Sequence, residues 1–285
     1  MPFRTPSNQD IPGSSVWSAA VEKFGGVDFV VEVTRRASEA ILEVYGRTDV
    51  QHREKEDRSP VTEADLAAAA LIEAELAATG IPVVCEETVS SATEAGELFW
   101  LVDPLDGTKE FLAKNGEFTV NIALISAGSP VLGVIGIPVT GEIYAAVRGC
   151  GAWRVTGDEA RPIRNGRAEE HLIAAVSRSH GSDAGERWLE ERGISGRVRC
   201  GSAIKFCRVA EGAADLYVRF GRTMEWDTAA GHCILLESGC RVISEKDGHE
   251  LTYGKPGFDN PSFIACRADL SLTAPAPMQP KVGNL

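Results

Sequence analysis

The chain has 285 residues, with 41 acidic and 29 basic side chains and a formal net charge of −12. This balance argues against binding to a nucleic-acid polymer, whose phosphates attract clusters of Lys and Arg. No apolar run approaches the length of a membrane span, and the polar, Pro-containing start of the chain does not resemble a signal peptide, so we expect a cytoplasmic protein.

The first half is predicted to contain two helices followed by strands. Residues 1–26 are rich in Pro, Ser and Gly, and we expect a loosely ordered extension there. Apolar residues at helical spacing predict a helix over 28–46, followed by a mobile, charged loop to residue 58. Thr62 is predicted to cap a second helix, with Asp65 one turn in. The predicted strands cover 81–85, a segment ending at Asp103, and a meander near 118–125, 131–137, 142–147 and 152–155.

The segment 157–168, rich in Gly, Asp, Arg and Asn, is the predicted domain boundary. It separates an N-terminal α+β domain over 27–165 from a C-terminal α/β domain over 166–285. The second half is expected to alternate strands near 171–177, 197–200, 214–219, 241–243 and 262–266 with helices over 183–192, over 203–211 and from about 226.

The most informative segment is Trp-Leu-Val-Asp-Pro-Leu-Asp-Gly-Thr-Lys-Glu-Phe over residues 100–111. Its apolar start indicates a buried strand that ends in Asp103 and Asp106. Two like charges at a buried strand end are costly unless a cation neutralises them. Gly107 lets the backbone approach a ligand closely, and Thr108 offers a hydroxyl and an amide. The segment therefore suits a divalent cation bound together with a phosphate.

Three further acidic residues fit the same site. Glu86 follows an apolar strand, Asp65 lies in the first turn of a predicted helix, and Asp227 lies near the start of another helix. Each residue alone is explained as well by a helix cap or a solvated strand end. Taken together with residues 103–108, they predict a metal site assembled from remote segments.

These motifs resemble the inositol monophosphatase superfamily of magnesium-dependent, lithium-sensitive phosphatases. The resemblance covers about residues 28–266. It rests on Asp-Pro-Leu-Asp-Gly-Thr over 103–108 and Trp-Asp-Thr-Ala-Ala over 226–230, together with 61–65, 86–87 and 116–121. It implies a layered sandwich that mixes α+β and α/β features, in the order α-β-α-β-α.

Within the superfamily, the sequence is most similar to the 3'(2'),5'-bisphosphate nucleotidases. The likeness lies in residues 108–111, 176–180, 201–207, 210–215 and 219–227. Three residues depart from the pattern, because Ser is more usual at Ala203, Pro at Arg222 and Gly at Cys240. None of them is an expected metal ligand, but Ala203 and Arg222 leave the fit to a nucleotide open.

The resemblance also implies a set of metal ligands. Glu86, Asp103 and the backbone carbonyl of Leu105 are expected to hold one Mg²⁺. Asp103, Asp106 and Asp227 are expected to hold a second Mg²⁺. Mg²⁺ prefers such oxygen ligands and keeps several waters, one of which can become the nucleophile.

The implied catalytic residues are Glu86, Thr108 and Asp65. The attacking water is expected between the metal, Glu86 and the Thr108 hydroxyl, with Asp65 near a weaker third metal site. Backbone amides of Gly107 and Thr108 are expected to cradle the phosphate. The other positions that match nucleotide contacts in similar proteins are Ser179, His180, Gly201, Ser202, Lys205 and Asp227.

The expected reaction is hydrolysis of the 3'-phosphate of 3'-phosphoadenosine 5'-phosphate to AMP, in sulfur assimilation. One alternative is an inositol or sugar monophosphatase on the same scaffold, and another is a non-catalytic, metal-dependent nucleotide sensor. The sequence leaves open a homodimer, a weak peripheral contact with the inner membrane face, and hydrolysis of the sulfonucleotide precursor.

Overall fold

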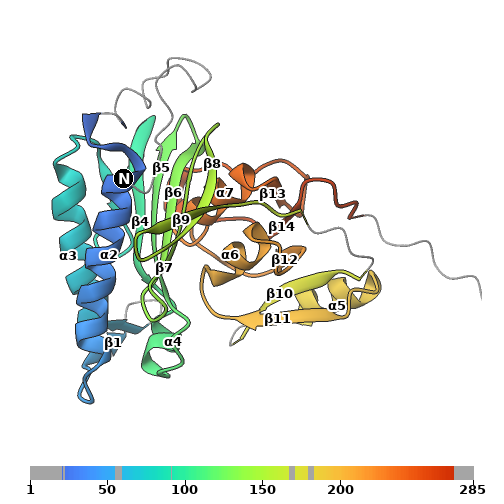
Figure 1. Cartoon of the computed structure of the whole chain (residues 1–285), viewed down its shortest axis with the longest axis horizontal. Coiled ribbons are helices and arrows are strands. Elements are labelled where there is room, and N and C mark those ends of the chain that lie inside the picture. Colours follow the sequence, from blue (N-terminus) through green and yellow to red (C-terminus); the bar gives the residue numbers. More distant parts are fainter. Residues whose placement is uncertain are drawn as a thin grey trace, which may run out of the picture.

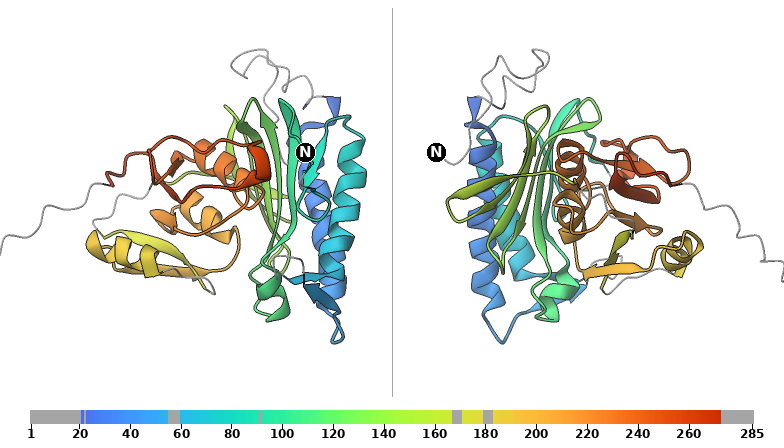
Figure 2. Two further views of the ribbon diagram at one scale, coloured as in Figure 1. Left: turned by 180° about the vertical axis from the view of Figure 1, so that it is seen from behind. Right: turned by 45° about the vertical axis from the view of Figure 1, so that its right-hand side comes forward.

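The computed structural model describes residues 21, 23–54, 60–90, 92–166, 171–178 and 183–272. Two helices, a seven-stranded sheet, a second pair of helices, a five-stranded sheet and an outer helix follow one another as layers (Figures 1 and 2). The predicted α-β-α-β-α order is therefore confirmed. Most of the predicted extension over 1–26 lies outside the described residues, and no helix within them is long and apolar enough to span a bilayer.

Helices α2 (Gly26–Tyr45) and α3 (Glu63–Ala77) form the first layer. Thr62 caps α3 as predicted: its side chain accepts from the Ala64 amide, and Asp65 accepts from the Thr62 amide. The predicted mobile loop before Pro60 is wrong in part, because β1 (His52–Glu54) pairs antiparallel with β2 (Pro60–Thr62). Its charged sequence has no apolar alternation, so only the pairing reveals the strand.

The seven-stranded sheet has the order β3-β4-β5-β6-β7-β8-β9. Only β3 and β4 run parallel in this sheet. The segment over 157–168, which the sequence predicts as a domain boundary, contains β9, a mostly exposed edge strand without an apolar pattern. The strands are β3 (Val83–Cys85), β4 (Leu98–Asp106), β5 (Thr119–Ser126), β6 (Ser129–Ile137), β7 (Glu142–Val147), β8 (Gly151–Thr156) and β9 (Glu159–Ile163).

The five-stranded sheet has the order β11-β10-β12-β14-β13, with β10 parallel to both β11 and β12. Its strands are β10 (Ile173–Ser177), β11 (Gly196–Cys200), β12 (Leu216–Arg219), β13 (Cys240–Ser244) and β14 (Phe263–Arg267). The remaining helices are α4 (Thr108–Leu112), α5 (Asp183–Glu191), α6 (Ile204–Ala210), α7 (Ala229–Glu237) and the 3₁₀ turn η1 (Pro256–Phe258). The alternation predicted for this half is confirmed.

Helices α6 and α7 lie between the two sheets (Figure 1). Their apolar residues join one buried cluster with side chains from both sheets. The approach is close: a Cβ added at Gly231 of α7 would stand 2.4 Å from the Phe206 ring, and one at Gly133 of β6 would stand 2.5 Å from the Ala230 carbonyl oxygen. This packing fixes the start of α7 against the face of the large sheet.

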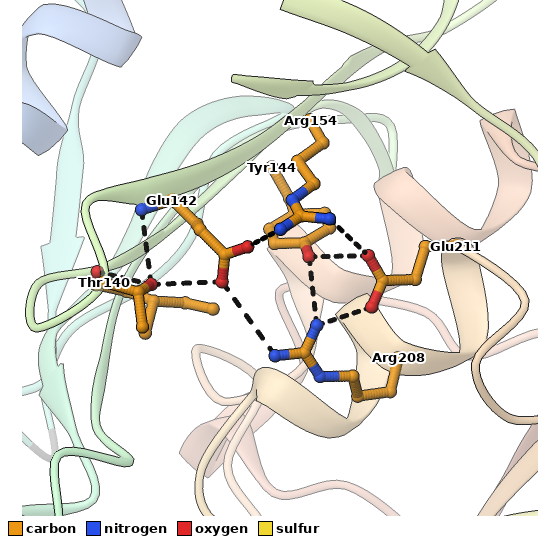
Figure 3. Close-up of polar contacts among 7 residues, drawn as sticks. Thr140, Glu142, Tyr144, Arg154, Arg208 and Glu211 are labelled. Atoms are coloured by element: carbon orange, nitrogen blue, oxygen red, sulfur yellow. Dashed lines mark hydrogen bonds and ion pairs between the residues drawn. The ribbon is translucent and has the colours of Figure 1, made fainter. Parts of the chain in front are cut away.

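A charged cluster fastens the end of α6 to strands β7 and β8 (Figure 3). We call Glu142, Tyr144, Arg154, Arg208 and Glu211 the arginine–glutamate cluster. Arg208 donates to Glu211 at 2.5 Å, and the Tyr144 hydroxyl donates to Glu211 at 2.8 Å. Arg154 donates to Glu142 and lies 3.5 Å from Glu211. Two guanidinium groups thus face two carboxylates, and the cluster is neutral.

Candidate metal and phosphate site

Three carboxylates from remote segments converge at the edge of the seven-stranded sheet. The parallel pairing of β3 with β4 sets Cys85 beside Val102, and the Glu86 amide donates to the Val102 carbonyl at 3.1 Å. This places Glu86 next to Asp103, while the turn before α7 brings in Asp227. One oxygen from each of Glu86, Asp103 and Asp227 lies within 4.8 Å of the others. The structure therefore brings together three of the predicted ligands.

The three side chains carry charges of the same sign, so none of them balances another. Asp103 is 1% exposed, and burial raises its pKa well above the usual value, with further increases from the charges of Glu86, Asp106 and Asp227. Burial and the same neighbours, Asp106 and Glu86, also raise the pKa of Asp227. Backbone amides hold the two groups in place: Leu105 donates to Asp103 at 3.1 Å, and Met224 donates to Asp227 at 2.8 Å. An all-oxygen, negatively charged cluster of this kind fits a hard divalent cation.

Asp106 lies beside this trio and is held by a hydroxyl. Its Oδ2 accepts from Ser202 Oγ at 2.6 Å, and Ser202 also contacts the Asp106 carbonyl oxygen at 3.0 Å. The β4–β5 register shifts between Asp103 and Asp106, which indicates a bulge at the Asp-Pro-Leu-Asp segment. Leu105, the predicted carbonyl ligand, lies within this bulge.

Thr108 and Asp65 form a hydrogen-bonded pair. Thr108 Oγ1 donates to Asp65 Oδ1 at 3.0 Å, while Asp65 Oδ2 accepts from the Thr62 amide at 2.8 Å and from the Thr62 hydroxyl at 2.6 Å. Burial raises the pKa of Asp65, and these hydrogen bonds oppose the increase. Because the Thr108 hydroxyl donates its one hydrogen to Asp65, its oxygen can accept a hydrogen bond from another molecule.

A cavity of about 230 Å³ lies beside these groups, and some of them line it. Of the predicted residues, its lining includes Glu86, Asp106, Gly107, Thr108, Ser202, Lys205 and Asp227. Asp103, Asp65, Leu105 and Gly201 do not line it. Gly107 has φ = 94°, and a Cβ there would stand 3.3 Å from Ser202 Cβ and from the Glu117 carbonyl oxygen. Glycine is therefore needed at this turn because of its backbone conformation and its close protein neighbours, and the predicted close approach to a ligand stays a prediction.

Lys205 supplies a buried cation at the other side of the cavity. It is 5% exposed, and its ammonium donates to the Ser202 carbonyl oxygen at 2.5 Å. Burial lowers its pKa, and the charge of Asp106 opposes this effect. The ammonium also lies 5.3 Å from the centre of the Tyr217 ring. Ser179 and His180, the other predicted nucleotide contacts, lie outside the described residues.

An ion pair that the sequence analysis did not assign holds the loop before Ser202. Glu117 accepts from the Arg178 guanidinium through two bonds of 2.6 Å and from the Gly201 amide at 2.8 Å. The hydrogen bonds from Arg178 lower the pKa of Glu117. Both residues lie in segments that carried the resemblance, over 116–121 and 176–180, but nothing in their spacing indicated that they meet.

The chain matches known proteins over most of its length. It is 43% identical to the 3'(2'),5'-bisphosphate nucleotidase CysQ of Salmonella typhimurium over 240 residues, which cover 82% of this chain and 96% of that protein. The corresponding Escherichia coli K12 protein is 42% identical over 243 residues, covering 83% and 98%.

The chain is also similar to solved structures over most of its length. The crystal structure of CysQ from Bacteroides thetaiotaomicron, described as a bacterial member of the inositol monophosphatase family, matches with a TM-score of 0.78 and 38% identity, covering 90% of this chain and 99% of that one. The IMPase of Thermotoga maritima matches with a TM-score of 0.70 and 26% identity, covering 84% and 91%. The family model for the inositol monophosphatase family matches residues 26–270, and the chain therefore belongs to that family.

Proposed function

We propose that this protein is a 3'(2'),5'-bisphosphate nucleotidase that uses Mg²⁺ to hydrolyse the 3'-phosphate of 3'-phosphoadenosine 5'-phosphate, giving AMP and phosphate. The observation that carries the proposal is the convergence of Glu86, Asp103 and Asp227 to within 4.8 Å, beside the Thr108–Asp65 pair. Relatives named 3'(2'),5'-bisphosphate nucleotidase at 42–43% identity over most of the chain support this substrate class.

The residues present fit a divalent cation. Asp103 and Asp227 have raised pKa values because they are buried among like charges, and a cation would remove that penalty. Glu86, Asp103, Asp227, Asp106 and the Leu105 carbonyl are the groups that would hold Mg²⁺. A bound Mg²⁺ would lower the pKa of a water and neutralise charge that develops on the phosphoryl group.

Thr108 and Asp65 orient the water. Asp65 is held by two bonds from Thr62, so it fixes the direction in which the Thr108 hydroxyl points. The Thr108 oxygen can then accept a hydrogen bond from a water in the cavity that Glu86 also lines. Asp103 and Asp106 are engaged by the Leu105 amide and by Ser202, which supports attack by water rather than by an aspartate.

Lys205 favours a substrate with two phosphates. Lys205 lines the cavity together with two other cationic residues, Lys109 and Arg219, and its ammonium can pair with a second anionic group. The aromatic ring of Tyr217 borders the same space and can pack against an apolar part of a nucleotide. An inositol or sugar monophosphate would leave Lys205 buried without an anionic partner from the substrate.

The test is phosphate release from 3'-phosphoadenosine 5'-phosphate, AMP and inositol 1-phosphate, each with and without Mg²⁺ and with added Li⁺. We expect the bisphosphate to be the best substrate, with a requirement for Mg²⁺ and inhibition by Li⁺. Preference for inositol 1-phosphate would favour the monophosphatase alternative. Tight nucleotide binding without turnover would favour the sensor.

A further inference from the structure

Four polar side chains form an unbroken line from the middle of the large sheet to Asp106. The β4–β5 pairing sets Asp103 opposite Asn121 and Asp106 opposite Thr119. Asn121 Oδ1 lies 2.9 Å from Thr119 Oγ1, which lies 2.6 Å from Ser202 Oγ, which lies 2.6 Å from Asp106 Oδ2. Thr119 and Asn121 are buried, so water does not compete for these bonds.

The number of protons fixes the direction of this line. Each hydroxyl has one proton, and two oxygens 2.6 Å apart need a proton between them. An ionised Asp106, which ligation of a cation requires, can only accept from Ser202. Ser202 then has no proton left for Thr119, so Thr119 must donate to Ser202. Thr119 then has no proton left for the Asn121 oxygen 2.9 Å away, so the donor of that bond must be Asn121.

Asn121 can supply that donor. With its carboxamide as placed, Asn121 Nδ2 is buried and makes no hydrogen bond to any described group. Rotating the amide by half a turn exchanges Nδ2 with Oδ1, so that Nδ2 donates to Thr119. The rotation also leaves an unpaired oxygen in place of an unpaired N–H, and a buried unpaired oxygen is the better tolerated of the two.

We propose that Asn121, Thr119 and Ser202 form a one-way hydrogen-bond chain that positions Asp106 for the cation. Ser202 occupies Oδ2 and leaves Oδ1 of Asp106 to the cation. The proposal rests on the proposed function, because it takes Asp106 as a metal ligand. Ser202 is then a positioning residue for the metal site. Its backbone adopts φ = 52°, a strained value for a residue with a side chain, which is consistent with a hydroxyl held in a fixed direction.

Ser202 also connects Asp106 with Lys205 across the cavity. Its hydroxyl holds Asp106, and its carbonyl oxygen accepts from Lys205. A displacement of Ser202 would therefore move a metal ligand and the buried ammonium together. This connection makes the metal site sensitive to residues of β5 that do not line the cavity.

Thr119→Val tests the chain, because it removes the hydroxyl and keeps the shape of a buried side chain. Mg²⁺ binding is measured by calorimetry on the full chain without nucleotide, and folding is checked by circular dichroism. We expect Mg²⁺ affinity to fall about 10-fold, the size of effect seen when a residue that orients a metal ligand is removed. Thr119→Ser should restore the affinity. As a control, Thr140→Val removes a hydroxyl that donates to Glu142 and takes no part in the Asn121–Thr119–Ser202 chain, so this variant should bind Mg²⁺ like the parent.

Ser202→Ala and the double variant with Thr119→Val complete the test. If the chain is continuous, the double variant should bind Mg²⁺ no more weakly than Ser202→Ala alone. Additive losses, or normal Mg²⁺ affinity in a folded Thr119→Val or Ser202→Ala protein, would overturn the proposal. Because binding is measured without nucleotide, a protein that fails to cleave the bisphosphate would count against the proposed function only.

Discussion

Two regions of this protein bury acidic side chains, and they solve the problem in opposite ways. In the arginine–glutamate cluster, Glu142 and Glu211 meet the guanidinium groups of Arg154 and Arg208 (Figure 3). At the candidate site, Asp103 and Asp227 meet Glu86 and Asp106 instead, and burial among these like charges raises the pKa of both aspartates. The charges of the first region balance within the chain, whereas we propose that a bound cation balances those of the second.

The two kinds of charged residue lie at opposite ends of one helix, α6. Arg208 and Glu211 lie at the end of α6 and hold it to strands β7 and β8. Lys205 lies in the first turn of the same helix and lines the cavity. Charges that fasten the scaffold are paired within the chain. We propose that a metal and a phosphate balance the acidic and basic charges at the cavity, so substitutions in the two regions should have opposite signatures.

The largest expected effect is on catalysis by Asp103→Asn. The change keeps the side-chain shape and the oxygen that accepts from Leu105, but it removes one charge from the acidic site. We expect kcat to fall at least about 100-fold, as follows from losing a few kcal/mol of charge stabilisation. The metal-free protein should unfold at the same or a higher urea concentration than the parent, because a like-charge repulsion is gone. Near-parental turnover would contradict the ligand role of Asp103.

The pH dependence of stability should distinguish the same variant from its parent. Asp103 has a higher pKa in the folded than in the unfolded chain, so it binds more protons when folded. In the metal-free parent this contribution to stability is lost as the pH rises from the unfolded value toward the raised folded value, by up to about 1.4 kcal/mol per pH unit.

The measurement is urea unfolding of the parent and of Asp103→Asn, in steps of about one pH unit between pH 4 and 8, with a chelator present. The stability difference should shift in favour of the variant as the pH rises. Saturating Mg²⁺ should reverse that trend by stabilising the folded parent. If the difference in unfolding free energy between the two proteins does not change with pH, the pKa of Asp103 is not raised in the folded chain.

The arginine–glutamate cluster should respond to Glu211→Gln in the reverse way. The substitution leaves Arg154 and Arg208 facing Glu142 alone, and it weakens the hydrogen bond from the Tyr144 hydroxyl. Because the two arginine side chains are 43% and 27% exposed, solvent screens part of the loss, and we expect about 1–2 kcal/mol less stability toward urea. Mg²⁺ affinity should stay at the parental value, and a large change in it would break the separation between the two regions.

Most of the fold followed from local patterns, and its exceptions are also local. The strand that ends at Asp103 and the cap at Thr62 were predicted because apolar runs and capping residues act over a few positions. Strands β1 and β9 were missed because neither has an apolar face, and only their partners define them. The acidic segment over 103–108 predicted a metal site from the residues themselves. The resemblance to a family supplied the assignment of individual ligands, since no spacing in the sequence shows that residues 86, 103 and 227 meet.

Contacts between side chains of remote segments could not be predicted. Ser202 was expected to touch a nucleotide, and its bond to Asp106 depends on how the turn at Gly107 packs against the loop at Gly201. Glu117 and Arg178 belong to separate motifs, and their pairing appears only once β5 and β10 are placed in space. Hydrogen-bond direction, burial and charge balance are properties of that placement.

The smallest expected effect belongs to Glu117→Gln, which tests the comparison at the border between the two kinds of region. Glu117 is paired with Arg178 like the glutamates of the cluster, but it also holds the Gly201 amide next to the cavity. Arg178 is 46% exposed, so breaking the pair should cost less than about 1 kcal/mol of stability.

A looser Gly201 should let Ser202 and Lys205 shift, which raises KM for the bisphosphate a few-fold. Mg²⁺ affinity measured without nucleotide should fall less than in Thr119→Val, because glutamine retains an oxygen for the Gly201 amide. A larger loss of Mg²⁺ affinity than in Thr119→Val would place Glu117 with the acidic site rather than with the scaffold.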